Sequence, residues 1–456
     1  MRKMILQCGF MALSLLATNV MAAVSADEAA KLGTSLTPMG AEKAGNADGS
    51  IPAYTGGIAV NAGTVDSKGF LSDPFANEKP LFTINAANAA QYKDKLSAGQ
   101  IAMLQRYPET YHIPVYPTHR TMALPQKVYD AVKRGATAIT TINDGNGLSA
   151  NFTDTRYYAF PIPKNGVEVL WNHITRYHGG SVHRTITQVT PQTNGAFDPV
   201  TFEEDIGAPD DIPDLDKAAG ANILTFFKQE VTKPARLAGN VLLVHETLDQ
   251  VKEPRQAWIY NAGQRRVRRA PQVAYDGPGT AADGLRTSDN FDMFSGAPDR
   301  YDWKLIGKKE MYIPYNSYKL DQPTLKYSDV VKAGHINQDL TRYELHRVWE
   351  VEGTLKPNER HIYAKRHMYI DEDSWQIALV DHYDGRGALW RVAEGHAEYF
   401  YNKQAAAYTL EALYDLNAGR YIALGMKNEE KHSYQFDQKF HVADFTPNAL
   451  RNAGIR

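Results

Sequence analysis

Cysteine is almost absent from this sequence, since the 456 residues include only Cys8. It lies within residues 1–22, which have a basic start at Arg2, an apolar stretch and small residues near Ala22, as secretory signals do. We expect cleavage near Ala22. The alternative is an uncleaved anchor, but the apolar stretch is shorter than the ~20 residues that a membrane span needs. The mature chain then has no disulfide, thiolate nucleophile or cysteine metal ligand.

A long apolar run and an excess of one charge are also missing. No stretch after residue 26 approaches ~18 consecutive apolar residues, the length that indicates a membrane-spanning helix. Lys and Arg number 50 against 52 Asp and Glu, which gives a net charge of −2. A nucleic-acid-binding protein usually has a basic excess. We therefore expect an exported, soluble protein that has no nucleic acid as a partner.

Motifs for cofactors and catalysis are absent as well. The chain has no Gly-x-x-x-x-Gly-Lys-Ser/Thr loop, no Gly-x-Gly-x-x-Gly turn, no His-Glu-x-x-His helix and no Gly-x-Ser-x-Gly turn. The acids at 371–373 occupy a turn, so we expect them to be solvated. The sequence predicts no cofactor and no catalytic residue. A hydrolase with two paired carboxylates stays open, because sequence does not show the separation of the two groups.

The spacing of the histidines gives little support for a metal site. His173, His178 and His183 recur every five residues, and odd spacing places them on alternating faces of a strand. His361 and His367 share a face with tyrosines and a lysine, which is typical of an amphipathic surface. We therefore predict no metal.

Tyrosine is abundant, with 26 residues against 16 Phe and 6 Trp, which favours a β-rich fold. From about residue 150, apolar side chains recur at every second position, and short turns rich in Gly, Pro, Asn and Asp separate the runs. Strands of about ten residues joined by short turns form an antiparallel meander. The predicted strands are 166–177, 240–248, 256–260, 264–270, 342–355, 360–370, 375–383, 388–401, 407–416 and 420–426.

The other segments predict helices, at 27–36, 86–106, 125–138 and 216–228. We expect an α+β, β-rich fold in which a large curled antiparallel sheet has helices packed on or closing its concave face. The helices near 88–136 and 216–228 are the expected lid. Beyond the signal peptide at 1–22, residues 23–456 are expected to form a single domain. It has a turn-rich and helical part at about 27–150, a β-rich part at about 151–430 and a tail at about 431–456.

A curled sheet of this size creates a groove or cavity, and aromatic side chains are frequent at its expected wall and rim. In 343–351, alternate residues share a face that packs or lines something, while Glu344 and His346 on the other face are expected to meet water. The alternative is that the aromatic residues cap the core. The candidate wall and rim residues are Trp258, Tyr260, Trp303, Tyr312, Tyr315, Tyr318, Tyr343, Leu345, Trp349, Val351, Trp375 and Trp390.

Four arginines lie within five positions at 265–269. Guanidinium groups suit phosphate or carboxylate, so a site for an anion or a lipid head group is one interpretation. Internal pairing with acids such as Asp283, Asp289 and Asp292 is another, and contact with a partner protein is a third. The candidate residues are Arg265, Arg266, Arg268 and Arg269.

Several long motifs resemble one known family. They lie at 36–57 (Leu-Thr-Pro-Met-Gly through Tyr-Thr-Gly-Gly), 258–271, 300–303, 313–316, 342–349, 371–375 and 381–384. Together they resemble the proteobacterial family known as domain of unknown function 1329, over about residues 30–450.

The resemblance implies an exported protein related to outer-membrane lipoprotein-sorting proteins of the LolA/LolB type. Such proteins have a half-barrel closed by helices, with a hydrophobic cavity for acyl chains. Family members often accompany an export pump of the resistance–nodulation–division type and an outer-membrane protein, which implies these as partners. The family has no established catalytic residues. The implied location is the periplasm, either free or peripheral to the outer membrane.

These observations favour a non-catalytic periplasmic carrier or chaperone that binds a lipid or other hydrophobic molecule. A glycan- or envelope-binding module is the first alternative, and a hydrolase with paired carboxylates is the second. An assembly factor that acts only through protein contacts is the third.

Overall fold

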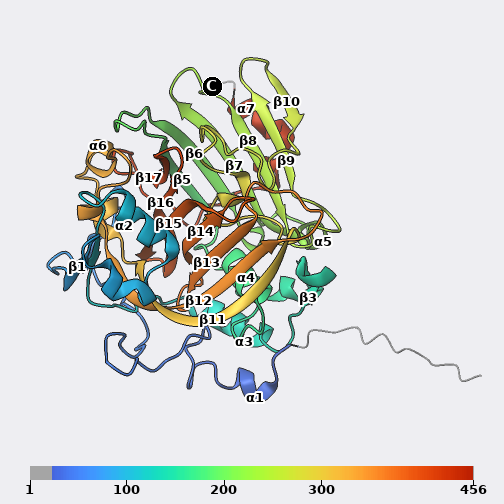
Figure 1. Cartoon of the computed structure of the whole chain (residues 1–456). Coiled ribbons are helices and arrows are strands. Elements are labelled where there is room, and N and C mark those ends of the chain that lie inside the picture. The colour runs from blue at the N-terminus through green and yellow to red at the C-terminus, as the bar shows by residue number, and fades with distance from the viewer. Residues whose placement is uncertain (1–22, 455–456) are drawn as a thin grey trace, which may run out of the picture.

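The computed structural model describes residues 23–454, so the predicted signal peptide at 1–22 lies outside the described part (Figure 1). Its strands are β1 (Phe82–Ile84), β2 (Ile113–Val115), β3 (Thr141–Ile142), β4 (Gly147–Leu148), β5 (Val182–Val189), β6 (Val200–Gly207), β7 (Ile223–Lys233), β8 (Val241–Thr247), β9 (Gln256–Asn261), β10 (Arg266–Arg269), β11 (Tyr301–Pro314), β12 (Tyr343–Leu355), β13 (Lys365–Asp371), β14 (Ile377–Tyr383), β15 (Leu389–Phe400), β16 (Ala405–Asp415) and β17 (Arg420–Met426).

The helices are short and lie between or around these strands. The α-helices are α1 (Ala26–Ala29), α2 (Ala98–Arg106), α3 (Gln126–Gly135), α4 (Gly166–Ile174), α5 (Lys217–Gly220), α6 (Tyr327–Val330) and α7 (Pro447–Ala453). Within residues 23–454, no helix combines the length and the apolar composition that crossing a bilayer requires.

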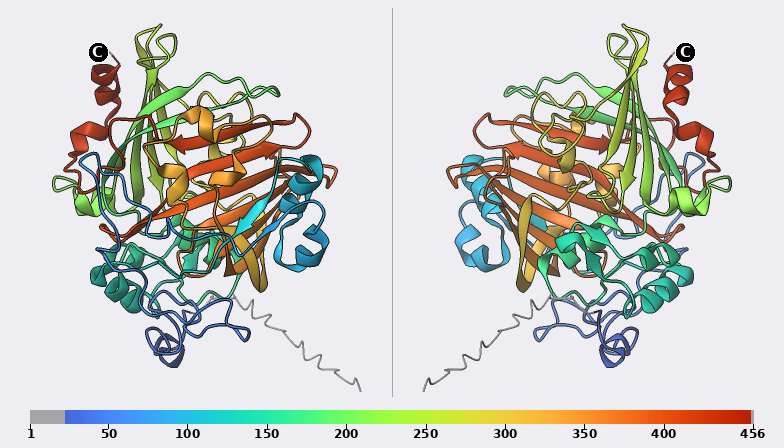
Figure 2. Two further views of the ribbon diagram at one scale, coloured as in Figure 1. Left: turned by 90° about the vertical axis from the view of Figure 1, so that its left-hand side faces the viewer. Right: turned by 90° about the vertical axis from the view of Figure 1, so that its right-hand side faces the viewer.

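One large sheet organises the molecule. Its hydrogen-bonded order is β1-β2-β12-β13-β14-β15-β16-β17-β5-β6-β7-β8-β9-β10, and β11 pairs with β12. Neighbouring strands are antiparallel apart from one parallel contact between β2 and β12. Figure 2 shows the curl of the sheet, because the green strands β6–β8 stand steeply against the orange and red strands β13–β17. The predicted α+β fold with a large curled antiparallel sheet is confirmed.

Both faces of the central strands are buried. Ala393 and Leu413 belong to one core cluster, and we call their side of the sheet the inner face. The adjacent residues Val392 and Ala412 belong to a second cluster on the opposite, outer face. Successive side chains of a strand point to opposite faces, so burial on both sides requires continuous apolar runs.

The helices are divided between these faces. Val128 of α3 and Val169 of α4 pack in the inner cluster. Met103 and Leu104 of α2 pack in the outer cluster. The expected lid over 88–136 is therefore only half correct, because its first helix covers the other face of the sheet.

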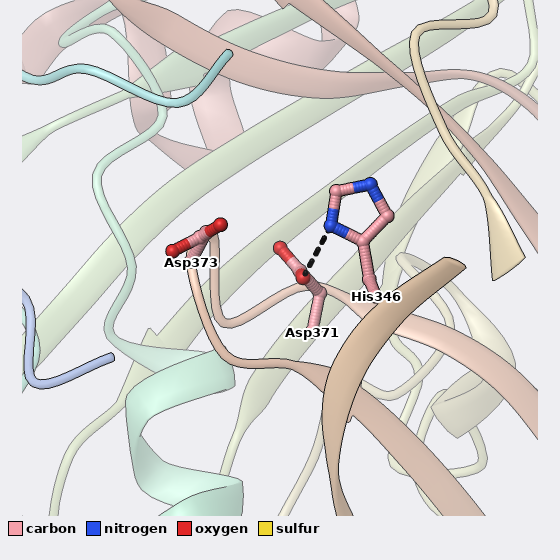
Figure 3. Close-up of side chains that lie close together, drawn as sticks. All are labelled: His346, Asp371 and Asp373. Atoms are coloured by element: carbon pink, nitrogen blue, oxygen red, sulfur yellow. Dashed lines mark ion pairs between the residues drawn. The ribbon is translucent and has the colours of Figure 1, made fainter. Parts of the chain in front are cut away.

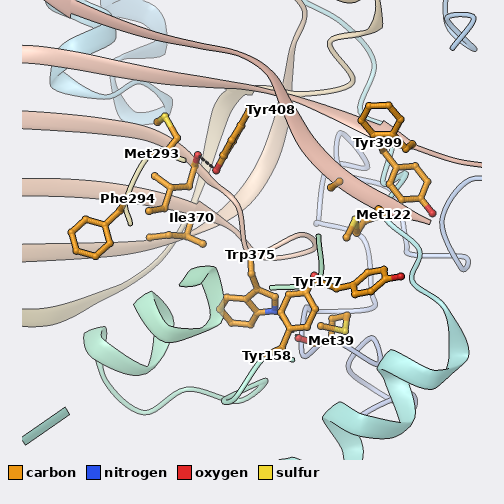
Figure 4. Packing of buried hydrophobic residues seen from close by; sticks show 14 of the residues in the cluster. Met39, Met122, Tyr158, Tyr177, Met293, Phe294, Ile370, Trp375, Tyr399 and Tyr408 are labelled. Atoms are coloured by element: carbon orange, nitrogen blue, oxygen red, sulfur yellow. Dashed lines mark hydrogen bonds between the residues drawn. The ribbon is translucent and has the colours of Figure 1, made fainter. Parts of the chain in front are cut away.

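The turn-rich segment near the N-terminus packs onto the same inner cluster. In Figure 4, Trp375 lies next to Met39 and Tyr158. The indole Nε1 of Trp375 donates a hydrogen bond to the backbone oxygen of Met39 at 3.0 Å. This segment has little regular structure of its own, and the sheet provides the body on which it lies.

Two predicted elements are wrong. The predicted strand at 166–177 is helix α4, whose start is capped by Asn165, since its side chain accepts the backbone N–H of Glu168 at 3.0 Å. β-branched and aromatic residues suggested a strand there, but the cap decides the local structure. The predicted helix at 216–228 is limited to α5, and β7 begins at Ile223. The strands β5, β6 and β11 were not predicted at all.

Candidate functional site

A cavity of about 230 Å³ lies on the inner face of the sheet. Strands β5 to β8 and β16 form its floor and sides. Residues 272–296, which follow β10 and which we call the strap, cross over it. The cavity therefore lies between one half of the curled sheet and the strap, and residues of 152–157 and 174–178 complete its lining.

The strands bring an apolar row to the cavity. Val182 of β5 lies opposite Ile206 of β6, which lies opposite Phe227 of β7, which lies opposite Val244 of β8. Paired residues in an antiparallel sheet point to the same face, so the row forms a continuous wall. Further apolar residues that line the cavity are Phe152, Ile174, Leu224, Leu242, Val273, Phe291, Phe294 and Ala407.

The strap is attached to the sheet and to α4 by buried polar contacts. His173 is hydrogen-bonded through Nε2 to the backbone oxygen of Asp292 at 2.9 Å. Glu411 of β16 accepts the backbone N–H of Met293 at 2.8 Å. Arg366 of β13 donates to Asp289 at 2.7 Å. These contacts hold the second half of the strap against the inner face.

Most charged groups on the cavity wall form ion pairs. Arg184 contacts Glu204 at 2.6 Å, Arg255 contacts Glu246 at 2.6 Å and Arg156 contacts Asp210 at 2.8 Å. Arg176 pairs with Asp292. Each of these cations is thereby neutralised within the wall.

Two wall residues differ from the rest. Arg286 is only 5% exposed, and within residues 23–454 its side chain has neither an ion pair nor a hydrogen bond. Burial lowers the pKa of Arg286, and nearby acids including Glu411 oppose the shift. Burial also raises the pKa of Glu411 to about 7, and Asp292 adds to the shift. The wall thus contains one unpaired cation and one carboxyl that is poised near neutrality.

The cavity is not lined by any of the sixteen sequence-predicted residues. Trp258 and Tyr260 lie in a cluster with α7 on the other side of β9. Trp349 stacks on Trp375 at 5.8 Å between ring centroids. Of the others, Trp303, Val351 and Tyr318 pack in the inner cluster, Tyr312, Tyr343 and Leu345 in the outer cluster, Tyr315 with Met311 and Val348, and Trp390 against Arg391. The chain's own segments fill the space beside these residues.

The four predicted arginines lie on and beside β10, the last strand in the sheet order, and β9 separates β10 from β8 and the cavity. Arg265, Arg266, Arg268 and Arg269 are exposed on and beside β10, away from the cavity lining. The acids proposed as internal partners are occupied elsewhere. Asp283 pairs with Arg420, Asp289 with Arg366 and Asp292 with Arg176.

Sequence reasoning missed the cavity because it missed β5 to β7. Three of the four strands that form the apolar row are β5 to β7, so the row is not recognisable without them. A usable signal was present in 223–233, where Phe227, Gln229 and Val231 alternate with Phe226, Lys228 and Glu230. Nothing in the sequence distinguishes Arg286 from the other arginines, since its lack of a partner is a tertiary property.

A second cluster of polar residues lies outside the cavity. Figure 3 shows His346, Asp371 and Asp373, whose ligand atoms lie within 4.8 Å of one another. Asp373 already receives two N–H groups of Arg120, at 2.7 and 2.8 Å, and His346 is hydrogen-bonded to Glu344 at 3.0 Å. Asp371 Oδ1 has no hydrogen-bond partner within the described residues and lies 3.9 Å from His346 Nδ1. Because Arg120 already neutralises Asp373, the cluster fits a structural network better than a metal site.

This network corrects two expectations. The acids Asp371, Glu372 and Asp373 were expected to be solvated, but they are buried. Glu344 and His346 were expected to meet water, and both are buried as well. Burial and then the neighbouring Asp373 raise the pKa of Asp371 to about 6.

Comparison with known proteins gives the family. The profile of the family described as protein of unknown function (DUF1329) matches residues 83–451. An uncharacterized protein of Pseudomonas aeruginosa, PA3922, is 68% identical over 454 residues, which cover 100% of this chain and 99% of that protein.

Among solved structures, three similar chains are a domain of Vibrio parahaemolyticus named for outer membrane lipoprotein sorting, a DUF1329 family protein of Desulfovibrio piger and the LolA superfamily protein NE2245 of Nitrosomonas europaea. Their identities are 14%, 13% and 12%, and their TM-scores are 0.43, 0.41 and 0.38. In the same order, the matched regions cover 63%, 60% and 63% of this chain and 98%, 92% and 100% of the three similar chains. From its motifs, the profile match and the relative of almost equal length, the chain belongs to the DUF1329 family.

Proposed function

We propose that this protein is a non-catalytic carrier that binds a hydrophobic molecule in the cavity beneath the strap, and that it works in the periplasm. The observation that supports the proposal is the apolar wall that β5 to β8 form along the cavity. Phe227, Leu242 and Phe291 line the cavity and remain partly exposed. Covering such apolar surface with a ligand stabilises the complex by roughly 25 cal/mol per Å².

The charges of the cavity favour binding over hydrolysis. A hydrolase of the paired-carboxylate type needs two available carboxyl groups. Asp210, Glu246 and Asp292 on the wall are each held in an ion pair. Within the described part of the chain, Glu411 is the one lining carboxyl without an ion pair, so the cavity lacks the second available group. Transfer of the cargo to an export pump or an outer-membrane protein stays a prediction.

The test is a cavity-filling variant compared with a matched surface variant. Leu242→Trp places an indole in the cavity, whereas Ile306→Trp places one on an exposed position of β11. We expect the purified wild-type protein and Ile306→Trp to release a stoichiometric hydrophobic compound on solvent extraction, as detected by mass spectrometry. Leu242→Trp should release much less while keeping its circular dichroism spectrum.

Two results would count against the proposal. The wild-type protein could release nothing, even after incubation with an envelope lipid extract. Alternatively, Leu242→Trp could retain the full amount of ligand, which would place the binding site outside the cavity.

A further inference from the structure

Arg286 lines the cavity without an ion pair or a hydrogen bond of its side chain within the described residues. We propose that its guanidinium binds the anionic head group of the carried molecule, and that the cargo is therefore an amphiphile with a carboxylate or phosphate head. This inference rests on the proposed carrier function and adds the chemistry of the ligand.

The argument begins with the contrast between Arg286 and the other arginines of the wall. Those at 156, 176, 184 and 255 each face a carboxylate within the protein. Three acids act on Arg286, and Glu411 has the largest effect. Glu411 accepts the backbone N–H of Met293 at 2.8 Å and forms no ion pair with Arg286 within the described residues. Glu204 accepts from Arg184 and Gln229, both at 2.6 Å, and Asp289 accepts from Arg366 at 2.7 Å. In the described part of the chain, no carboxylate forms an ion pair or a hydrogen bond with the Arg286 side chain.

A buried cation without a partner is costly, because removal from water is not compensated by hydrogen bonds or an opposite charge. The local packing nevertheless keeps the guanidinium in place. A Cβ on Gly279 would lie 2.9 Å from Arg286 Cζ and from Nη2, so the strap has a glycine where any side chain would displace the group. Gly279 also donates its backbone N–H to the oxygen of Arg286 at 2.9 Å. The close fit positions Arg286 at the cavity wall.

The surroundings of Arg286 indicate an amphiphile rather than a free anion. Its Cζ lies 5.6 Å from the ring centroid of Phe291. Phe291 contacts Phe227 at 5.2 Å between centroids, and Phe227 lies opposite Val244 in the sheet. An apolar path therefore leads from the cation into the row on β5 to β8. A charged head at Arg286 leaves the attached tail against these aromatic and aliphatic side chains.

The experiment measures how well ligands of one tail length displace a neutral fluorescent probe, N-phenyl-naphthylamine, from the delipidated full-length protein. Dodecanoate, dodecyl phosphate and dodecanol share the tail and differ in the head. We expect both anionic ligands to bind about 10- to 100-fold more tightly than dodecanol, the range for a hydrogen bond to a charged group. Arg286→Gln should reduce the affinity for dodecanoate and dodecyl phosphate to that for dodecanol and leave dodecanol unchanged.

Two further variants separate charge from position. Arg268→Gln removes an exposed arginine of β10 and should leave all affinities unchanged. Gly279→Ala keeps the cation but displaces it, so the preference for anionic ligands should weaken without loss of dodecanol binding. The ligand-free Arg286→Gln protein should melt at the same or a higher temperature than the wild type, because an unpaired buried charge has been removed.

The outcomes distinguish this inference from the carrier function itself. Equal binding of dodecanol and dodecanoate to the wild type would overturn the inference and leave the carrier function intact. Failure of the neutral probe and of every tailed ligand to bind would overturn both. If acetate or inorganic phosphate displaced the probe as effectively as the tailed anions, the amphiphile would be excluded in favour of a free anion.

Discussion

Arg120 joins parts of the chain that are far apart in the sequence. Its Nε and Nη2 atoms donate to Asp373 at 2.8 and 2.7 Å, and Nη2 also donates to the backbone oxygen of Glu42 at 2.8 Å. Both side chains of the ion pair are buried, with 3% of each exposed. The pair therefore ties the turn-rich N-terminal segment to the turn between β13 and β14.

Replacing this arginine should be strongly destabilising. In Arg120→Met the carboxylate of Asp373 stays buried without its counter-charge, and we expect the free energy of unfolding to fall by about 3–5 kcal/mol. Urea denaturation followed by tryptophan fluorescence measures the change. The control is Arg386→Met, since the side chain of Arg386 is 93% exposed, and it should stay within about 0.5 kcal/mol. A similar small effect at both positions would contradict the structural role of Arg120.

Glu394 makes stability depend on pH. Burial raises its pKa to about 7, although hydroxyl donors including Tyr111 at 2.9 Å and Tyr343 at 3.0 Å oppose the shift. The ordinary value is 4.5. Between these two values the folded protein holds a proton that the unfolded chain has released. The free energy of unfolding therefore decreases as pH rises from 4.5 to 7, by up to about 3 kcal/mol from this group.

Glu394→Gln removes this titration. The stability of the variant relative to the wild type should rise steadily with pH between about 5 and 8 and then level off. Chemical denaturation of both proteins at matched pH isolates the effect, because other titrating groups are common to the two. A difference that is independent of pH would show that Glu394 does not titrate in this range.

At the scale of elements, the C-terminal helix supports the cavity from behind. Leu450 of α7 is fully buried with Leu243 of β8 and Tyr260 of β9. Leu242 and Val244 alternate with Leu243 along β8 and face the cavity. Strand β8 is thus held between α7 on one face and the cavity on the other.

Leu450→Ala should loosen these strands. Loss of a buried leucine costs about 2–5 kcal/mol. We expect faster amide hydrogen exchange in β8, β9 and β10, with β13 to β16 unchanged at early times. Arg451→Ala, an exposed position of the same helix, is the matched control. Uniform acceleration across the whole sheet would mean that α7 contributes to global rather than local stability.

The elements that sequence predicts well share one property. Strands β12 to β17 have long alternating or continuous apolar runs and are separated by short turns, so local pattern and tertiary structure agree. Helix α4 is the opposite case, because its valines and Trp171 favour a strand while the Asn165 cap and the packing onto β11 produce a helix. In β6 and β7, charged residues such as Glu204 and Lys228 interrupt the alternation of apolar and polar residues. Their ion pairs with Arg184 and Asp205 become evident only in the fold.

At the scale of the whole molecule, the family and the curled sheet could be predicted, and the site could not. The sequence predicts the apolar face of β12 to β16 as the wall of a cavity, but α3, α4 and the N-terminal segment cover this face. The cavity lies instead beside β5 to β8, where the strap and residues of 152–157 and 174–178 cover the sheet only in part. Which part of a curved surface stays uncovered depends on how distant segments pack, and local periodicity carries no information about that.

The arginine cluster lies on β10, which is an edge strand of the large sheet. Strand β10 pairs only with β9, so its outer edge has free backbone groups within the described sheet. Arg266, Arg268 and Arg269 are exposed on this strand. Charged side chains on an edge strand oppose pairing with a strand of another molecule.

Arg266→Thr combined with Arg268→Thr should therefore promote self-association. We expect larger species in analytical ultracentrifugation that increase with protein concentration, with little change in the melting temperature. Lys133→Thr combined with Arg134→Thr on the surface of α3 removes the same charge from a helix and is the control. Equal association of the two double variants would point to net charge rather than to the strand edge.

The open ends of the sheet also affect what the cavity can hold. In a closed barrel the number of strands and their stagger determine the internal diameter. Among residues 23–454 the sheet is not closed in this way, since β10 and β1 lie at separate ends of the strand order. The radius of curvature can relax through small changes of twist while every ladder hydrogen bond is kept. For the proposed carrier, we expect such elasticity to let one scaffold accept tails of different bulk, with the strap contacts limiting the movement.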